Sequence, residues 1–436
     1  MATNLGLVGT GDWATDQMPE NWREGILFEY PNGDAPLTAM TAKMKSKKVD
    51  SPILHWWTQA LATQRASFTA GEMYINVTLE TAYVRATHGL TVGIAGGILY
   101  VKMAAAQVAQ FREGHMVLIR DADVSTVDKR AKVVDRVVAG ASSYLAVKLL
   151  EADATSGTGL ATADTVLIIG TINPQGSERP EGVQDLPTQI DSYTQIFRNA
   201  VDLTRTAMRT RLRTGDPLKE ARRQALEKHS IEMEKAFIWG IPTTGTGTNG
   251  KPEYTTAGLD YVLRTYASDN VNDFSLNATY SGDTWLQSGE TWLNIYLEQI
   301  FRRGRDSKLA FCGSGALLGL NQLALQGANI QLTPQSAQYG ISVTQWVTPF
   351  GIINLKRHPL FSYEATDRNT MLIFEPERLT YDFIDDTTFH EDSTWNKGGG
   401  SGLDAIQEDY LTECAMEWDL PSSGGILRGV GLASAV

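Results

Sequence analysis

Residues 216–240, DPLKEARRQALEKHSIEMEKAFIWG, constrain the fold more than any other stretch, because they predict one long helix with both ends defined. Asp216 can cap the first turn through its carboxylate, and Pro217 suits the first helical position because its missing N–H has no partner there anyway. Gly240 can end the helix with a positive φ. At about 1.5 Å per residue the helix is roughly 35 Å long, enough to span a domain.

Two faces of this helix are predicted. Apolar residues recur at three- and four-residue spacing, which predicts a buried stripe along one side: Leu218, Ala221, Ala225, His229, Met233, Ala236 and Phe237. Charged residues cover the remaining surface, which we expect to face solvent: Lys219, Arg222, Arg223, Glu227, Lys228, Glu232, Glu234 and Lys235. A charged helix face is ordinary solvated surface, so the helix alone indicates no function.

The composition indicates a globular chain of two or three domains, with 42% hydrophobic and 20% charged residues. A net charge of −12 argues against a protein that coats nucleic acid, because such surfaces present clustered Lys and Arg to phosphate. Cys312 and Cys414 could pair but form no disulfide framework. The sequence shows no secretory signal and no run of about 18 apolar residues, so we expect a cytosolic protein at synthesis.

Before the long helix the sequence predicts several different kinds of structure in turn. Residues 1–20 predict an extended arm that depends on a partner. Residues 21–44 predict two short helical pieces around a turn, residues 52–57 (PILHWW) a strand, and residues 58–85 a half-exposed ribbon. The basic clusters at 43–48 and 205–213 are either solvated loops or contacts with an acidic neighbour or nucleic acid.

Residues 89–173 contain five short apolar runs separated by turn signals, which predicts a small closed barrel or sandwich. The segment that follows, NPQGSERPEG, is polar and ribbon-like again, so the five strands are interpreted as an insertion. Residues 193–212 predict a second helix, because apolar residues recur there at helical spacing.

After the long helix, residues 241–380 alternate helix and strand in one compact domain. IPTTGTGTNGKP predicts a loop, GLDYVLRTY and TWLNIYLEQIFRRG predict amphipathic helices, and KLAFCGS predicts a buried strand before the helix GALLGLNQLALQG. ISVTQWVTPFGIINLKRHP predicts a hairpin, and TMLIFEPERLTYDFI predicts a strand pair broken at Pro376. QEDYLTECAMEWDLP predicts a final strand at a half-buried sheet edge.

The motifs predict no catalytic site. The loop from Gly245 to Lys251 has the phosphate-loop spacing GxxxxGK, but Pro252 stands where a magnesium-binding Ser or Thr belongs, and the loop follows a helix. The histidines are scattered, and no GxSxG motif is present. One acidic run could bind a cation, or be a solvated loop or an intersubunit contact: Asp382, Asp385, Asp386, His390, Glu391 and Asp392. We therefore expect no enzyme, no cofactor and no metal.

The order of these parts resembles the major capsid proteins of tailed bacteriophages, which have the HK97-like fold. The resemblance is carried by NWREGILFEYPNGDAPLTAMTAKM, EGHMVLI, GSERPEG with SYTQIFRNAVDLTRTA, LEKHSIEMEKAFIWG and AFCGSGALLGL, which resemble the SU10-like branch in particular. It covers nearly the whole chain in order. It implies an α+β fold with an N-terminal arm, an extended loop, a peripheral domain with a long spine helix, and an axial domain.

The resemblance also implies domain boundaries. Residues 1–52 would form the arm, and residues 58–188 the extended loop that carries a small β-barrel insertion at 89–173. The peripheral domain would combine the strand at 53–57, the segment 189–242 with the spine helix, and the return strands and C-terminus at 375–436. The axial domain would be 243–374.

The implied function is structural: self-assembly through pentamers and hexamers into an icosahedral head shell around double-stranded DNA. The implied partners are further copies of the chain, a separate scaffolding protein, the portal, decoration proteins, and packaged DNA through weak non-specific contact, with no membrane. The implied locations are the host cytoplasm during assembly and then the virion capsid. Some relatives join subunits by a Lys–Asn isopeptide bond; its positions cannot be matched to this sequence, so we claim no such bond.

An arm and a ribbon that cannot satisfy their own backbone groups need neighbours, so we expect intersubunit contacts on them. The predicted contacts are Trp22, Tyr30, Leu37 and Met40 as anchors of the arm, Arg179 with Glu181 as a pair across subunits, and Arg302, Arg303 and Asp306 in the axial contacts. Two alternatives are an encapsulin-like compartment that holds cargo protein, and a nucleotide-binding enzyme that uses the loop from Gly245 to Lys251.

Overall fold

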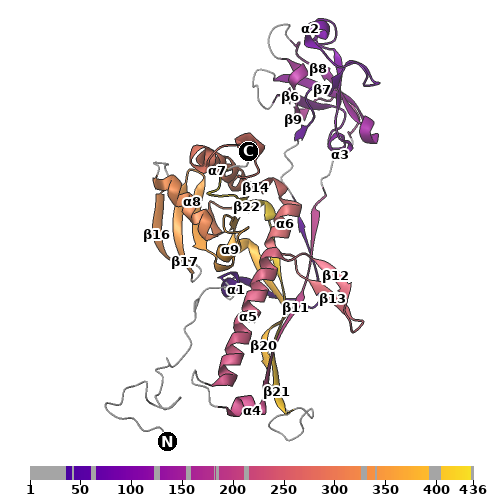
Figure 1. Cartoon of the computed structure of the whole chain (residues 1–436). Coiled ribbons are helices and arrows are strands. Elements are labelled where there is room, and N and C mark those ends of the chain that lie inside the picture. The colour runs from indigo at the N-terminus through magenta and orange to yellow at the C-terminus, as the bar shows by residue number, and fades with distance from the viewer. Residues whose placement is uncertain are drawn as a thin grey trace, which may run out of the picture. The chain divides into compact units, whose positions relative to one another are not determined.

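The computed structural model describes residues 36–41, 44–59, 65–121, 128–153, 159–180, 182, 186–210, 216–325, 331–338, 341–391 and 404–433. The chain divides into two compact units, because Gln59–Thr188 is inserted between Met1–Thr58 and Gln189–Val436. The described chain combines helices with sheets whose strand pairs are mostly antiparallel, which confirms the predicted α+β class (Figure 1). No helix within the described residues is both long and apolar enough to cross a membrane.

The long helix is α5 (Pro217–Trp239), and its N-terminus is built as predicted. The Asp216 carboxylate accepts the backbone N–H of Leu218 at 2.9 Å. Gly240 differs from the prediction, because its φ is −59° rather than positive. Glycine is needed there for space: a Cβ on Gly240 would lie 2.6 Å from the carbonyl oxygen of Thr256, and a Cβ on Gly258 would lie 2.4 Å from the nitrogen of Gly240.

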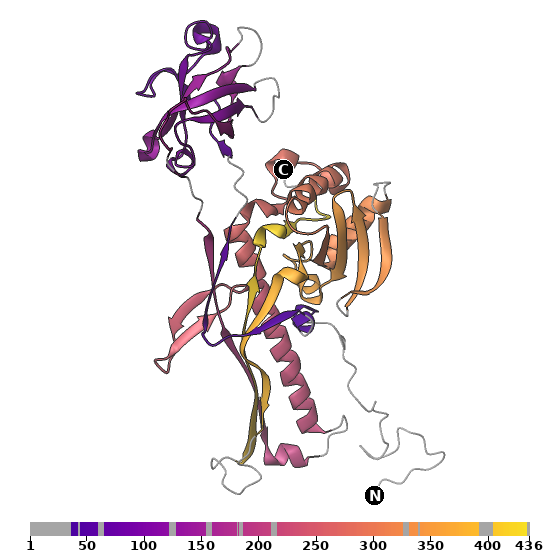
Figure 2. The same ribbon diagram turned by 180° about the vertical axis from the view of Figure 1, so that it is seen from behind.

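A four-stranded sheet lies along α5, with the strand order β1–β20–β21–β11 (Figure 2). Its strands are β1 (Lys45–Lys48), β20 (Leu379–His390), β21 (Ala405–Trp418) and β11 (Gln195–Thr204). β1 runs parallel to β20, and the other pairs are antiparallel. Phe237 of α5 contacts Phe197 of β11 and Tyr381 of β20 edge-on, so the helix and sheet share one core.

Three sequence predictions for this sheet are wrong. Most of the helix predicted at 193–212 is strand β11, followed by the short helix α4 (Arg205–Arg209). Phe197 and Val201 are four apart and thus fit a helix, but both also lie on one side of a strand, and ladder pairing with β21 selects the strand. The predicted edge strand β21 lies between β20 and β11, and the lysines at 45–48 form edge strand β1 instead of a loop.

Two short ribbons complete this unit beside the main sheets. β2 (Ile53–Thr58), predicted as a strand, pairs with β10 (Thr188–Tyr193), and the Trp56 indole N–H donates to the carbonyl oxygen of Trp418 at 3.0 Å. β12 (Thr243–Thr246) and β13 (Pro252–Thr255) form a hairpin where we predicted a loop. Threonine favours strands, and this bias outweighs the glycine content of the segment.

The second large sheet of this unit has seven strands. Their order is β14 (Val271–Asp273), β22 (Gly425–Arg428), β19 (Met371–Phe374), β15 (Ser307–Cys312), β18 (Gly351–Arg357), β17 (Ile341–Thr348) and β16 (Gln331–Gln338). The predicted strand at β15 and hairpin β17–β18 are confirmed. β19 and β20 flank Pro376 as predicted, but they belong to different sheets.

Four helices accompany this sheet: α6 (Leu259–Tyr266), α7 (Trp285–Phe301), α8 (Ser314–Leu325) and α9 (Pro359–Tyr363). The predicted helices at α6, α7 and α8 are confirmed. Phe274, Trp285 and Trp292 contact one another edge-on within the sheet's core. Cys312 and Cys414 are buried and form no disulfide.

The inserted unit contains its own seven-stranded sheet and core. Its strand order is β3 (Arg65–Ser67), β9 (Thr165–Thr171), β6 (His115–Arg120), β7 (Lys129–Val137), β8 (Tyr144–Leu149), β5 (Ile98–Lys102) and β4 (Met73–Tyr74), and it also holds the short helices α2 (Arg85–His88) and α3 (Ala105–Val108). The five predicted strands are present. The ribbon predicted at 58–85 is wrong, because β3 and β4 join the sheet and Phe68, Met73 and Tyr83 are buried in its core.

Candidate assembly surfaces

The root of the arm is fixed to the spine helix by one buried carboxylate. Glu234 of α5 has no solvent exposure, although the sequence predicts it on the wet face. Its Oε1 accepts the backbone N–H of Leu37 at 2.9 Å, and its Oε2 accepts the N–H of Thr38 at 2.7 Å and the Thr38 hydroxyl at 2.8 Å. The carboxylate therefore supplies partners for the first N–H groups of α1 (Pro36–Thr41).

A histidine 124 residues further along the chain contacts the same carboxylate. His358 is fully buried, and its Nε2 donates to Glu234 Oε1 at 2.8 Å. Glu234 thus joins α1, α5 and the segment before α9 in one hydrogen-bonded cluster. A buried carboxylate is stable only when such partners surround it, so the cluster fixes α1 against α5.

Leu37 and Met40 complete this anchor. Both side chains are fully buried in the core that contains Met233 and Phe237 of α5. They do anchor the arm, but to their own subunit. The prediction of intersubunit contacts through these two side chains is corrected here, because a fully buried side chain presents no surface to a neighbour.

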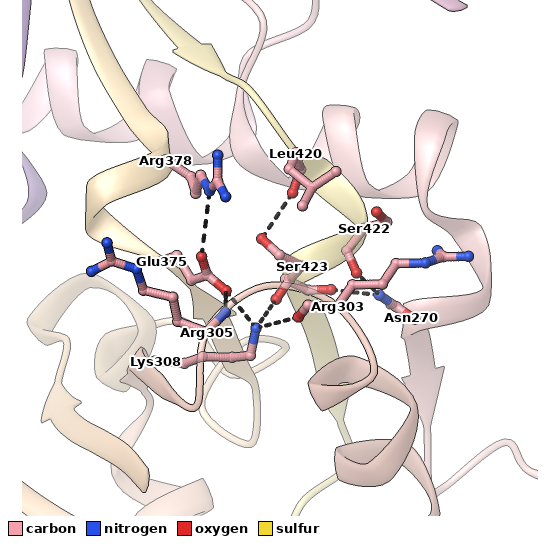
Figure 3. Close-up of polar contacts among 10 residues, drawn as sticks. Asn270, Arg303, Arg305, Lys308, Glu375, Arg378, Leu420, Ser422 and Ser423 are labelled. Atoms are coloured by element: carbon pink, nitrogen blue, oxygen red, sulfur yellow. Dashed lines mark hydrogen bonds and ion pairs between the residues drawn. The ribbon is translucent and has the colours of Figure 1, made fainter. Parts of the chain in front are cut away.

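A second buried charge lies at the end of α7, where Lys308 of β15 meets Glu375 (Figure 3). The Lys308 ammonium donates to Glu375 Oε1 at 2.7 Å and to the carbonyl oxygens of Ser423 at 2.7 Å and Arg303 at 2.9 Å. All three of its donors are therefore used. Burial lowers the pKa of Lys308, while the hydrogen bond to Glu375 acts in the opposite direction.

These contacts hold the loop between α7 and β15 in place. Glu375 Oε1 also accepts the backbone N–H of Arg305 at 2.7 Å, and Arg303 is held through its carbonyl oxygen. Between them Gly304 has a φ of +84°, and a Cβ there would lie 1.8 Å from Glu375 Oε1. Only glycine fits this close approach at this φ, so residues 303–305 have one defined path.

The side chains of this loop face outward, over the buried pair. Arg302 pairs with Glu298 one turn earlier at 2.7 Å, and Arg305 pairs with Glu377. Asp306 is exposed, and its carbonyl oxygen accepts the N–H of Ile352 at 2.7 Å. The loop is thus a charged surface on a rigid support, which suits a specific contact with another protein.

The segment with phosphate-loop spacing does not form a phosphate cradle. The Gly247 N–H donates to the carbonyl oxygen of Lys251 at 2.8 Å, and the Gly250 N–H donates to that of Gly247 at 2.9 Å. A cradle needs such N–H groups directed at phosphate, whereas these close the turn of the β12–β13 hairpin. The geometry gives no support to a nucleotide site there.

The acidic run also gives no metal site within the described residues. They contain no group of three or more His, Cys, Asp or Glu side chains arranged to hold a metal ion. Asp382 is fully buried, whereas Asp385 and Asp386 are exposed on the same strand. Burial, followed by the nearby Glu417 carboxylate, raises the pKa of Asp382 to about 7. Asp392 lies outside the described residues.

A family model described as the SU10 major capsid protein matches residues 10–431. The chain belongs to the SU10 major capsid protein family. The major capsid protein of Pseudomonas phage PaMx41 is 24% identical over 417 residues, which cover 93% of this chain and 91% of that protein. The family expected from the sequence is confirmed.

Two solved structures give looser matches. A chain of Microbacterium phage Oxtober96 aligns with 94% of this chain and 96% of its own length, at 11% identity and a TM-score of 0.41. The encapsulin SrpI of Synechococcus elongatus aligns with 58% of this chain and 79% of its own, at 10% identity and a TM-score of 0.39.

The structure does not bring the predicted contact residues of this SU10-family chain together in one place. Arg302, Arg303 and Asp306 lie together on the exposed loop after α7. Arg179 is exposed in the inserted unit, far along the chain from that loop. Trp22, Tyr30 and Glu181 lie outside the described residues.

Sequence reasoning missed the buried charges that organise these surfaces. One feature of the sequence indicates that Glu234 is buried. It lies four residues before the apolar Ile238, so the two residues share one side of α5, and both are buried. The sequence gives a weaker indication that Lys308 and Glu375 are buried. Lys308 begins the apolar run KLAFC, and Glu375 directly follows the apolar run MLIF. Neither signal identifies the partner, because Lys308 and Glu375 are 67 residues apart.

Proposed function

We propose that this chain assembles through pentamers and hexamers into the icosahedral head shell of a tailed phage, around double-stranded DNA. The observation that carries the proposal is the match of residues 10–431 to a major capsid protein family. The matched residues include the inserted unit and the large sheets of the other unit.

Apolar side chains that no other part of the described chain covers support assembly. β2 and β10 form an isolated two-stranded ribbon whose outer face exposes Ile53 (43%) and Trp57 (61%). On β11, Ile196 is 61% exposed. Two-stranded ribbons are marginal by themselves, and open strand edges with apolar side chains are sites where another chain can pack. Neighbouring subunits would supply that cover.

The proposal includes specific contacts and partners. Arg302, Arg303 and Asp306 would act in the axial contacts, Arg179 and Glu181 would pair across subunits, and Trp22 and Tyr30 would anchor the arm. The partners would be further copies of the chain, a scaffolding protein, the portal, decoration proteins and weakly held DNA. A net charge of −12 suits a container whose wall must not bind DNA tightly. Assembly would take place in the host cytoplasm, and the chain would act without catalysis.

Negative-stain electron microscopy with mass photometry on the purified chain, over a range of concentrations, tests this proposal. We expect closed shells, or rings of five or six subunits, whose population grows with concentration. A monomer that persists at every concentration, with scaffolding protein added, would contradict assembly.

The contents of the particles test the remaining alternatives. A phage shell isolated from infected cells should protect double-stranded DNA from nuclease, whereas an encapsulin-like compartment should hold cargo protein. Lys251→Ala should leave particles unchanged, and the wild type should bind no nucleotide in equilibrium dialysis. Nucleotide binding that is lost in Lys251→Ala would favour the enzyme alternative.

A further inference from the structure

The inserted unit contains a basic pocket, and of its lining residues only Arg179 takes part in the contacts proposed above. It has a volume of about 780 Å³ and lies against β7 and β8, between the turn at Glu113–Gly114 and the coil after β9. Five cationic side chains and a single carboxylate line it: Arg112, Lys132, Arg136, Lys148 and Arg179, with Glu113. These are five of the basic residues of a chain whose net charge is −12.

Two of these lysines lie directly opposite each other. Lys132 of β7 and Lys148 of β8 are paired in the antiparallel register. Like charges at directly opposed positions of a sheet repel and destabilise it. Neither lysine has an acidic partner among the described residues. The pair therefore carries a repulsion that a bound anion would remove.

Two of the three arginines of the pocket, Arg112 and Arg136, are held in place by the inserted unit itself. Arg136 NH1 donates to the carbonyl oxygens of Ala109 at 3.0 Å and Phe111 at 2.8 Å. Arg112 Nε donates to Nε2 of His115 at 3.0 Å, so that histidine acts as an acceptor in its neutral form. Burial lowers the pKa of His115, and the charges of Arg112 and Arg136 lower it further, which reports the positive potential here.

We propose that this pocket binds a carboxylate-rich segment of a second copy of the chain. The proposal rests on the assembly proposed above. Held guanidinium groups and ammonium groups that converge on one hollow match carboxylates well. Each copy has more Asp and Glu, 50, than Lys and Arg, 38, so a neighbouring copy offers the complementary charge. Nucleic acid would instead need a continuous basic track, and this hollow is bounded and includes Glu113.

The first test measures ligand binding apart from assembly. Fluorescein-labelled hexaglutamate is titrated with the dissociated full-length chain and followed by fluorescence anisotropy. We expect the wild type to bind, and Lys132→Ala/Lys148→Ala to bind at least tenfold more weakly. The matched control is Lys102→Ala in the same unit, whose lysine pairs with Glu72 at 3.0 Å; we expect binding within twofold of wild type. Thermal unfolding checks that the double variant is folded, which we expect because the change removes a repulsion.

Equal binding by the wild type and the double variant would overturn the pocket assignment. Tighter, pocket-dependent binding of a single-stranded dT12 oligonucleotide than of hexaglutamate would overturn the protein ligand and indicate nucleic acid. Both outcomes concern the pocket alone and leave the shell proposal intact.

The second test connects the pocket to assembly. Under conditions where the wild type forms shells, hexaglutamate should reduce shell yield several-fold, and Lys132→Glu/Lys148→Glu should do the same without added peptide. Normal shell yield in both cases would overturn the second copy as the occupant. A wild type that binds hexaglutamate but forms no shells would contradict the proposed function and, with it, the assignment of a second copy.

Discussion

At the residue scale, Lys308 shows how one buried charge shapes the surface above it. Its ammonium joins the loop after α7 to Glu375 and to the turn before β22, and it lies 5.2 Å from the centre of the Phe301 ring. Removal of either partner of a buried ion pair destabilises the fold, because the remaining charge loses its main partner and has no water in its place. The exposed ion pairs around Lys308 contribute much less to the stability of the fold.

Lys308→Met should therefore destabilise the folded chain by about 3–5 kcal/mol, because the buried Glu375 carboxylate would lose its ammonium partner and keep only the Arg305 N–H and the more distant Arg378 at 3.7 Å. The free energy of unfolding from urea titration measures this. Arg302→Ala is the control, since its pair with Glu298 is exposed to solvent and should contribute little to stability. Lys308→Met/Glu375→Leu should recover much of the loss, and a double variant as unstable as the single one would refute this account.

Glu234→Gln should loosen the root of the arm. A glutamine has one acceptor oxygen for the Leu37, Thr38 and His358 donors that two carboxylate oxygens now accept. Each donor left unpaired costs about 1–3 kcal/mol. Hydrogen exchange at the Leu37 and Thr38 amides should accelerate at least tenfold. Glu227→Gln, which alters only a half-exposed pair with Arg223, should leave their exchange unchanged, and an equal effect in both variants would contradict the role of Glu234.

Asp382 should make stability depend on pH. Its pKa is raised to about 7 by burial and by Glu417, with a further contribution from Asp419 and an opposing one from Lys47. The folded chain keeps the proton that the unfolded chain releases near pH 4, so stability is lost as pH rises from about 4 to about 7.

Asp382→Asn removes this titration. The variant should be more stable than the wild type by about 2–4 kcal/mol above pH 7, and the difference should shrink towards pH 4. Unfolding free energies at a series of pH values give the measurement, with the exposed Asp385→Asn as control. A difference that does not change with pH would show that Asp382 is not the titrating group.

At the element scale, the C-terminus of α5 depends on a close crossing with the chain before α6. Gly258 donates its N–H to the carbonyl oxygen of Gly240 at 2.8 Å, so the two backbones touch with no side chain between them. The sequence predicts the end of the helix at Gly240 but attributes it to backbone conformation. The crossing explains it instead, since φ at Gly240 is accessible to any residue.

Gly258→Ala should destabilise the chain by about 1–3 kcal/mol, because its Cβ would enter the space of the Gly240 nitrogen and the Ile238 carbonyl oxygen. Thermal unfolding measures the change. Gly245→Ala, in the β12–β13 hairpin, is the matched control, because its Cβ would meet nothing closer than 4.0 Å. Equal melting temperatures for the two variants would argue against a tight crossing.

At the scale of the whole molecule, folding and assembly should be separable at the root of the arm. α1 belongs to the core of its own subunit through Leu37 and Met40, so a truncation that keeps residues 36–44 should not harm the fold. Deletion of residues 1–35 should leave the unfolding midpoint unchanged and abolish closed shells in electron micrographs. A longer deletion of residues 1–44 should also lower stability. Normal shells from the first truncation would contradict the assembly role of the arm.

The insertion belongs to this scale as well. Its core contains residues from Ala66 to Val166 and is distinct from those of the larger unit. The sequence indicates its five main strands because each is a short apolar run between turn signals. It does not indicate β3 and β4, which have three and two residues, and whose membership of the sheet depends on partners far along the chain.

The sequence by itself determined the elements whose signals are local. The spine helix has its cap, its proline and its apolar stripe within 25 residues, and β15, the β17–β18 hairpin and the helices α6 to α8 are likewise defined by their own patterns. The quoted stretches also determined the family, which the match over residues 10–431 confirms.

Only the tertiary structure decided features that depend on a distant partner. β11 is a strand because β21 lies beside it, against an equally good helical pattern. Glu234 is buried because the N–H of Leu37, 197 residues away, meets it, and Lys308 because Glu375 does. Burial of a charge costs free energy that local sequence cannot offset, so its position is set by where the fold brings donors and acceptors together.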